Sequence, residues 1–475
     1  MLRKFVGSEL VSDTIILSLG NVAQKIVLLL LMPLYTSLLT ASEYGTVEIV
    51  ISSVLILVPL ATLNIHGAVF RFAIEDDGNR EYLLKFSLGI ILKATIIISI
   101  IAVILRLFNF EFYWTLIIIL FSTYSLKFIL ADYVRAIGQV TLFAIAGICA
   151  TLSLAMSNII FFSIYKAGIE AYFVSIIISN LVNILILIFH SKDIWPCLLK
   201  SLSLKSVYNL RAGNAKKGKE YLHYSIPLIP NTISWWINSE SSKYILIFFW
   251  GVSFAGLYTA ALKIPSIINL FSMVFQQAWQ YYASKEIENK DKLVLFRSIY
   301  RNFCGFMLII CTILILLSKP ISSIILKNEF FSAWIYVPFL IYSATIAVVS
   351  VFFGGLFIAE KNTKGLMKTT VVGSAVSLFL SLLLIQFIGI GAIVIASIIG
   401  NIVILLIRIS MCSKKLNFTF NQKILLISLA FLLIQCFCIV KGSMASKSFS
   451  VIIMIIVVLV NVVYALKMHK LVDYA

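Results

Sequence analysis

Long apolar runs, separated by short polar stretches, follow one another along almost the whole chain. Most runs are long enough for an α-helix to cross the hydrocarbon core of a membrane, which takes about 20 residues. Six runs lie at about 13–39, 44–72, 82–107, 112–136, 140–165 and 169–190. Eight more lie at about 222–250, 253–282, 298–318, 331–358, 366–387, 390–411, 424–440 and 449–466. The pattern predicts an all-α polytopic membrane protein with about fourteen transmembrane helices.

Composition narrows the class of protein further. Hydrophobic residues make up 61% of the 475 residues and charged residues only 12%, a balance that excludes a soluble globular protein. The seven cysteines show no paired CxxC spacing and the four histidines are scattered, so no disulfide framework or metal site is indicated. We expect no cofactor.

The distribution of Lys and Arg predicts the orientation in the membrane. With the N-terminus in the cytoplasm, 27 of the 38 basic residues fall on the inner side, 6 on the outer side and 5 within the apolar runs. Cytoplasmic loops carry such an excess, and a miscounted helix would reverse every later loop and spoil the asymmetry. Both termini are therefore predicted to be cytoplasmic, and the net charge of +18 is a topology signal rather than a sign of nucleic-acid binding.

The two halves of the chain resemble each other weakly. Residues 168–171 and 177–180 align with 389–392 and 398–401 at a constant offset of 221, and 43–45 with 254–256 at an offset of 211. Each half then starts on the cytoplasmic side, which predicts a parallel repeat with a pseudo-twofold axis along the membrane normal. The predicted parts are a six-helix lobe at 1–190, a basic cytoplasmic linker at 191–221, a second six-helix lobe at 222–412 and two additional helices at 413–475.

Polar side chains recur at helical spacing on four of the predicted helices. In the first half these are Ser18, Asn21 and Lys25 on the first helix, and Glu48, Ser52, Thr62 and His66 on the second. In the second half they are Asn231, Trp235, Asn238, Glu240, Ser242 and Lys243 on the seventh helix, and Thr259, Lys263, Ser266, Asn269, Gln276 and Gln280 on the eighth. Four such faces can enclose one wet cavity. The alternative is that these residues join helices to one another, as in many membrane bundles.

Five lysines lie inside the apolar runs. An ammonium at bilayer depth costs about 2.5 to 3.5 kcal/mol on insertion scales, so it usually faces a wet cavity or an anion. Lys25 and Lys263 have no near carboxylate in the sequence, which favours an anionic substrate. Lys243 either serves the same purpose or pairs with Glu240. Lys93 and Lys127 have a structural alternative, in which they reach the cytoplasmic interface or Asp132.

No enzyme site is found. The stretch 213–220 imitates a phosphate-binding loop, but Glu220 stands where Ser or Thr should hold magnesium, and no strand precedes it. A glycosyltransferase or polymerase needs carboxylates at an outer surface, whereas the outer loops are short and carry only isolated acids. We therefore expect a protein that is not an enzyme.

The order and spacing of several short motifs resemble the Wzx-type polysaccharide flippases. That family belongs to a superfamily with the multidrug and toxin extrusion antiporters and the lipid II flippase. The motifs are Pro33–Thr36, Glu43–Gly45, Arg71-Phe72, Ile226–Pro230, Gly256–Tyr258, Lys263–Pro265 and Gly389–Ala392.

The resemblance implies a protein of the bacterial cytoplasmic (inner) membrane. Its substrate would be a polyprenyl-pyrophosphate-linked oligosaccharide repeat unit for O-antigen, capsule or exopolysaccharide, carried outward by alternating access through a cationic cavity. Expected partners are this lipid, membrane lipids, a polysaccharide polymerase and a chain-length regulator, and we expect a monomer without bound nucleic acid. The predicted head-group ligands are Lys25, Lys263, Lys243, Arg71, Asn21, His66 and Asn269, and the predicted ion-coupling residues are Glu48, Asp132 and Glu240.

A multidrug or cation antiporter of the same superfamily is the alternative. Such a protein needs buried carboxylates in its cavity, and the predicted spans contain few, namely Glu48, Asp132 and Glu240. A positively charged cavity favours the flippase, and a negatively charged cavity favours the antiporter.

Overall fold

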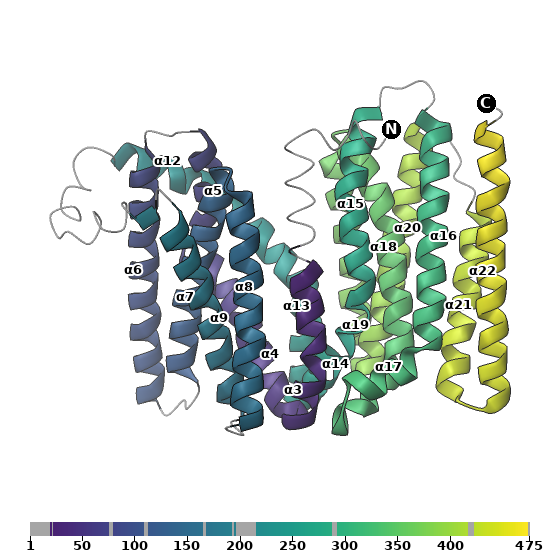
Figure 1. Cartoon of the computed structure of the whole chain (residues 1–475), viewed down its shortest axis with the longest axis horizontal. Coiled ribbons are helices and arrows are strands. Elements are labelled where there is room, and N and C mark those ends of the chain that lie inside the picture. The colour runs from purple at the N-terminus through teal and green to yellow at the C-terminus, as the bar shows by residue number, and fades with distance from the viewer. Residues whose placement is uncertain are drawn as a thin grey trace. The chain divides into compact units, whose positions relative to one another are not determined.

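The structure is a computed structural model in which the described residues form helices and turns. It describes residues 20, 22–75, 79–108, 113–164, 168–191, 194–195, 215–286, 292–416 and 422–473. Within these ranges no residue lies in a strand. The chain divides into two compact units, one made of Met1–Leu34 and Thr46–Ser241 and the other of Tyr35–Gly45 and Ser242–Ala475. Figure 1 labels the helices.

The first unit is a helical bundle with an apolar centre. Its helices are α4 (Ala41–Ala61, from Thr46 onward), α5 (Ile65–Glu75), α6 (Arg80–Leu107), α7 (Trp114–Ala136), α8 (Val140–Ile159) with its π-helical extension η2 (Ile160–Ile164), α9 (Ile169–His190) and α12 (Ala215–Ser225). Val69, Leu84, Leu130 and Leu187 bring α5, α6, α7 and α9 together in one core. The buried Tyr221 of α12 packs against the aromatic rings of Phe72 and Phe86.

The second unit is built around one central helix. Its elements are α14 (Val252–Leu262), α15 (Ser266–Glu286), α16 (Lys292–Leu316), α17 (Ser318–Ile325), η4 (Asn328–Tyr336), α18 (Val337–Ala359), α19 (Thr363–Ile388), α20 (Ile390–Leu416), α21 (Lys423–Lys441) and α22 (Met444–Asp473). Most residues of α18 are buried, because α15, α16, α20 and α21 pack around it. The Trp279 indole stacks on Phe352 and donates its Nε1 hydrogen to the Phe352 carbonyl at 2.8 Å. The helix α13 (Ile229–Trp250) follows the short η3 (Ile226–Leu228), and its residues belong to the first unit up to Ser241 and to the second from Ser242.

Each of the fourteen predicted runs coincides with helix in the described part of the chain. Eleven helices there are long and apolar enough to cross a membrane, and α14 with α15 makes a twelfth. The other two runs correspond to the shorter apolar helix Val22–Leu38, whose end is α3 (Met32–Leu38), and to the more polar α13. The N-terminal residues 1–19 and most of the predicted linker, 196–214, lie outside the described residues. The prediction of an all-α polytopic membrane protein is confirmed.

Two predicted spans, 44–72 and 253–282, each consist of two helices. α4 ends at Ala61 and α5 begins at Ile65, because Leu63 and Asn64 have φ of 55° and 53°, a left-handed conformation that an α-helix cannot contain. The α14–α15 pair bends by 51° at residues 263–265, where Pro265 lacks the amide hydrogen that a continuous helix requires.

Eleven residues from the first half of the chain pack in the second unit, and we call Tyr35–Gly45 the exchanged segment. The Thr36 hydroxyl donates to the Ile325 carbonyl at 2.8 Å, and the Ala41 amide donates to the Glu329 carboxylate. These contacts, almost 290 residues apart in the sequence, attach the start of α4 to α17 and η4.

Two glycines allow α4 and α14 to touch through their backbones. A Cβ at Gly45 would collide with the Val252 carbonyl oxygen, and a Cβ at Gly256 would collide with the Ala41 carbonyl oxygen. Gly45 and Gly256, like Ala41 and Val252, are separated by the offset of 211 found in the sequence. The contact is therefore reciprocal, as it is between elements related by a twofold axis.

A second pair of equivalent contacts joins Asn180 and Asn401, which are 221 residues apart, to Thr123 and Ser343, which are 220 residues apart. In the first unit the Asn180 amide donates to the Thr123 hydroxyl at 3.4 Å, and in the second the Asn401 amide donates to the Ser343 hydroxyl at 3.0 Å. Each bond joins the last helix of a predicted lobe to an earlier helix of the same lobe, α9 to α7 and α20 to α18. The internal repeat therefore extends to buried polar contacts.

The last two helices form an antiparallel pair beside α16 (Figure 1). The Gln435 amide of α21 accepts a hydrogen bond from the Thr312 hydroxyl at 2.8 Å and donates to the carbonyls of Thr312 and Ser450 at 3.2 and 3.4 Å. All of these residues are buried, and a polar side chain in such surroundings is favourable only when it is hydrogen-bonded. Gln435 therefore fixes how α21 and α22 pack on α16.

Candidate functional site

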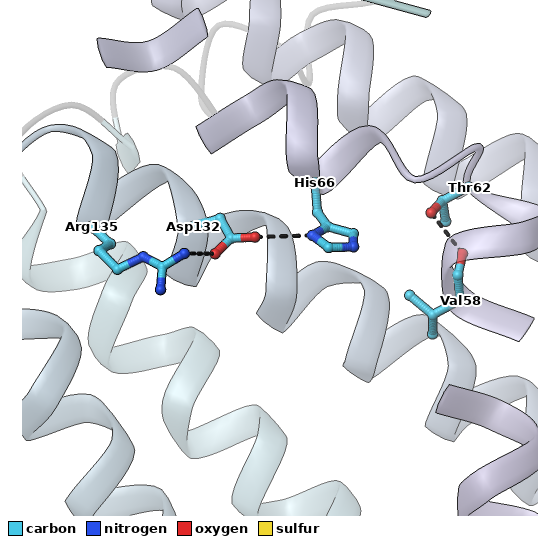
Figure 2. A network of polar contacts seen from close by, with 5 residues as sticks. All are labelled: Val58, Thr62, His66, Asp132 and Arg135. Atoms are coloured by element: carbon cyan, nitrogen blue, oxygen red, sulfur yellow. Dashed lines mark hydrogen bonds and ion pairs between the residues drawn. The ribbon is translucent and has the colours of Figure 1, made fainter. Parts of the chain in front are cut away.

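Three polar side chains of the first unit form a linear network between α5 and α7. Figure 2 shows the Asp132 carboxylate between His66 and Arg135, with His66 Nδ1 at 3.0 Å from Oδ2 and Arg135 Nη2 at 3.0 Å from Oδ1. His66 projects from α5 just after the helix break, while Asp132 and Arg135 lie one turn apart on α7. The break allows His66 to face Asp132.

The surroundings of this network hold it in place. The Arg135 guanidinium lies over the Phe70 ring at 4.4 Å and near the Phe143 ring at 5.9 Å. The side chain of Asp132 is 19% exposed and that of His66 is 31% exposed. The network is therefore partly buried and packed against aromatic rings.

A second polar group of the first unit contains the predicted residue Glu48. Glu48 is buried on α4. Lys127 Nζ lies over the Tyr124 ring at 5.7 Å and donates to Asn180 Oδ1 of α9 at 3.1 Å. Lys127 therefore joins α7 to α9 inside the bundle.

Lys127 has a neutral hydrogen-bond partner. The sequence left open whether it reaches Asp132, but the structure joins Lys127 to Asn180 and Asp132 to His66 and Arg135. The position of Lys127 in the repeat corresponds to an alanine, Ala347, in the second unit. The Asn180–Thr123 contact has an equivalent in the second unit, whereas the hydrogen bond from Lys127 to Asn180 does not.

The predicted basic residues lie in different surroundings. Lys25 and Arg71 are exposed, Lys263 is half-buried, and Lys243 is 9% exposed. Lys263 occupies the break between α14 and α15, where its carbonyl accepts a 2.5 Å hydrogen bond from the Ser266 hydroxyl.

The remaining predicted site residues are more scattered. Asn269 is exposed on α15, Glu240 is half-buried on α13, and Asn21 lies outside the described residues. Within the described part of the chain, a hydrogen bond joins two residues of the predicted set, His66 and Asp132.

The sequence missed a buried arginine in the second unit. Arg408 lies near the inner end of the predicted run 390–411 and counts among the inner-side basic residues, but in the structure it is buried within α20, at 9% exposed. Its guanidinium donates to the Ser350 carbonyl at 3.0 Å and to the hydroxyls of Thr369 and Thr370 at 3.2 and 3.0 Å. It therefore joins α18, α19 and α20. No local signal reveals this role, because all of its partners come from other helices.

Within the described ranges, no group of three or more His, Cys, Asp or Glu side chains is arranged to hold a metal ion.

Solved transporter structures share this fold. The lipid II flippase MurJ, in an inward closed conformation, is 14% identical, with a TM-score of 0.63 over 96% of this chain and 100% of that one. An inward-facing multidrug resistance MATE family transporter of the MOP superfamily is 13% identical, with a TM-score of 0.61 over 84% of this chain and 94% of that one. A MOP superfamily transporter from Pyrococcus furiosus, whose reversed pocket polarity suggests a different function, is 14% identical, with a TM-score of 0.55 over 86% and 96%.

Sequence comparison identifies the family. A search of curated proteins finds no match. The profile of the family described as "Polysaccharide biosynthesis protein" matches residues 10–280, which is more than half of the chain. The match includes both polar groups of the first unit and the break at Lys263. The chain therefore belongs to the polysaccharide biosynthesis protein family.

Proposed function

We propose that this protein is a flippase for a polyprenyl-pyrophosphate-linked oligosaccharide repeat unit. It carries the lipid from the cytoplasmic to the outer leaflet, where the unit enters a surface polysaccharide such as O-antigen, capsule or exopolysaccharide. Membership of the polysaccharide biosynthesis family supports this class of substrate. The proposal describes a transporter rather than an enzyme.

The observation that carries the proposal is the extent of the structural match. The lipid II flippase covers 96% of this chain, whereas the MATE transporter covers 84%. The difference between these two coverages corresponds to about as many residues as the α21–α22 pair contains. The comparison with the flippase therefore favours a function in which these two additional helices take part. A lipid substrate has long chains that need an apolar surface, and these helices expose one.

Basic side chains inside the spans suit a diphosphate head group. Lys243 is buried, and Lys263 lies where the helix is interrupted. Diphosphate carries at least two negative charges, and ammonium groups bind phosphate well in surroundings of low polarity. We propose that the head group is bound by Lys25, Lys243 and Lys263, with Arg71, Asn21, His66 and Asn269 contributing.

The His66–Asp132 pair is proposed to couple transport to protons. Loss of the proton from His66 would weaken its attraction to Asp132, and the α4–α5 break next to His66 would allow α5 to move. Glu48 and Glu240 are further candidates for ion binding. The membrane potential is a second source of energy, worth about 2.3 kcal/mol per charge at 100 mV.

We further propose the arrangement of this protein in the cell. It lies in the bacterial cytoplasmic membrane with both termini in the cytoplasm, acts as a monomer, and passes its substrate to a polysaccharide polymerase and a chain-length regulator. Its functional lobes are proposed to be 1–190 and 222–412, joined by the linker 191–221 and followed by the two additional helices at 413–475.

The first experiment measures lipid-linked oligosaccharide in cells that lack this protein. Single repeat units should accumulate on the cytoplasmic leaflet, and the intact gene supplied in trans should remove them. If the protein carries a different substrate, the amount of these lipid intermediates should not change in the deletion strain. That result would contradict the proposal.

A multidrug or cation antiporter remains the second candidate. The fold shared with MATE transporters and the buried acid Glu48 favour it. Cells that lack an antiporter would become sensitive to cationic dyes while their lipid-linked oligosaccharides stay normal. The same deletion strain therefore separates the two functions.

A further inference from the structure

A pocket in the second unit is lined by none of the residues proposed above. It lies between α16, α21 and α22. Its wall includes Arg297, Tyr300 and Arg301 of α16, Leu425 of α21 and Asn461 of α22.

The pocket is basic. Arg297 and Arg301 lie one helical turn apart, so they project from the same face of α16. Arg301 is 6% exposed and Tyr300 is 4% exposed, whereas Arg297 is half-buried toward the mouth. Among the described residues that line the pocket there is no carboxylate. Two guanidinium groups at this spacing suit an anion with several oxygens, because each can donate two parallel hydrogen bonds.

The opposite wall is held in place by its own hydrogen bonds. The Asn461 amide of α22 donates to the Val457 carbonyl at 2.8 Å and to the Ser428 hydroxyl of α21 at 3.4 Å. Gly305 of α16 faces Asn461, and a Cβ at Gly305 would lie in ordinary van der Waals contact with the Asn461 Cβ, at 3.6 Å. The pocket is thus a formed feature of the three-helix contact.

The position of the arginines points to a ligand that belongs to the membrane. Arg301 lies in the span Leu293–Leu316, about 12 Å from its first residue at 1.5 Å per residue. Apolar side chains on other faces of the same three helices are exposed, including Phe306 at 52%, Leu426 at 50% and Val463 at 59%. A basic pocket bordered by apolar helix faces can hold a head group while acyl chains lie along the helices.

We propose that this pocket binds the phosphate of an anionic phospholipid. Arg297 and Arg301 bind the phosphate oxygens, and the acyl chains cover the exposed faces of α16, α21 and α22. In the proposed topology this end of the three helices is cytoplasmic, where a lipid of the inner leaflet reaches the pocket. The bound lipid would join the additional helices to the rest of the second unit, independently of what the protein transports.

The test uses the full-length protein in detergent and measures bound lipid by native mass spectrometry. Phosphatidylglycerol should form a one-to-one complex and raise the melting temperature, and zwitterionic phosphatidylcholine should do neither. Arg297→Gln should weaken phosphatidylglycerol binding about tenfold, since a hydrogen bond to a charged group contributes about that much. Lys368→Gln, which removes an exposed charge from α19, is the matched control and should leave binding unchanged.

Three results would overturn the proposal. Phosphatidylcholine could bind as well as phosphatidylglycerol, or inorganic phosphate could stabilise the protein as much as the lipid does. A polyprenyl diphosphate that binds the pocket in strong preference to phosphatidylglycerol would assign it to the transported lipid instead. Arg301→Gln strengthens the test, but Arg297→Gln decides it, because the half-buried Arg297 can be replaced with less risk to folding.

Discussion

Lys263 and Lys93 are both lysines inside apolar spans, but they differ in their surroundings. Lys263 lies in the α14–α15 break, whereas Lys93 is exposed on α6 among Leu92, Ile96 and Ile97, which are all more than half exposed. We expect Lys263→Ala to reduce polysaccharide export roughly 10- to 100-fold, as the loss of a charge-assisted hydrogen bond of about 1.5–3 kcal/mol predicts. Surface polysaccharide, quantified per amount of protein in the membrane, measures this effect.

Lys93→Ala is the control for that experiment, because it removes the same charge from the same kind of helix. Export should remain close to that of the wild type. Equal export by the Lys263→Ala and Lys93→Ala variants would remove the case for Lys263 as a head-group ligand.

Asp132 accepts hydrogen bonds from two side chains at once, so its replacement tests the coupling proposal. Asp132→Asn keeps the shape but removes the charge that holds His66 and Arg135. Transport in proteoliposomes should then lose its response to an imposed pH gradient while it still responds to membrane potential. Thr62→Val is the control, since Thr62 donates only to the Val58 carbonyl of its own helix turn in the network of Figure 2. A pH response that survives in Asp132→Asn would rule out this pair as the proton site.

At the scale of elements, one side chain joins three helices of the second unit. Arg408 holds α18, α19 and α20 together through hydroxyl and carbonyl groups. Arg408→Lys keeps the charge but cannot reach all of these partners, so we expect a loss of about 1–3 kcal/mol of stability. Thermal unfolding in detergent would measure it, with Arg106→Lys, an exposed arginine near the end of α6, as the control. Equal melting temperatures of the two variants would show that the contacts of Arg408 contribute little.

The positions of the helices could be predicted from the sequence, but only some of their interruptions could. A span is a local property, since about twenty apolar residues suffice to define it, and each predicted run lies in helix where the chain is described. Pro265 marks the α14–α15 break in the sequence. The break after Ala61 depends on left-handed Leu63 and Asn64, neither of which is a glycine. The same limit applies to the site: the charge of Arg408 is visible in the sequence, whereas its partners on α18 and α19 are brought to it only by folding.

At the scale of the whole molecule, the asymmetry of basic residues predicts the topology. In a variant without cysteines, Ser443→Cys in the α21–α22 turn should react with a membrane-impermeant maleimide in intact spheroplasts. Lys364→Cys, at the start of α19, should react only after the membrane is made permeable. Both sites are exposed, so accessibility within the protein does not limit labelling. Labelling of Lys364→Cys from outside would reverse the proposed orientation.

The exchanged segment has a consequence for biosynthesis. Its residues leave the ribosome early, but its packing partners around Val252 and Glu329 follow more than 200 residues later. At roughly 5–20 residues per second, Tyr35–Gly45 waits on the order of 10 to 60 s for the surface it will occupy. During this time the backbone faces of Gly45 and Ala41 stay without their partner helix. A nascent chain arrested before α14 is therefore expected to be a better client for membrane chaperones and proteases than one arrested after η4.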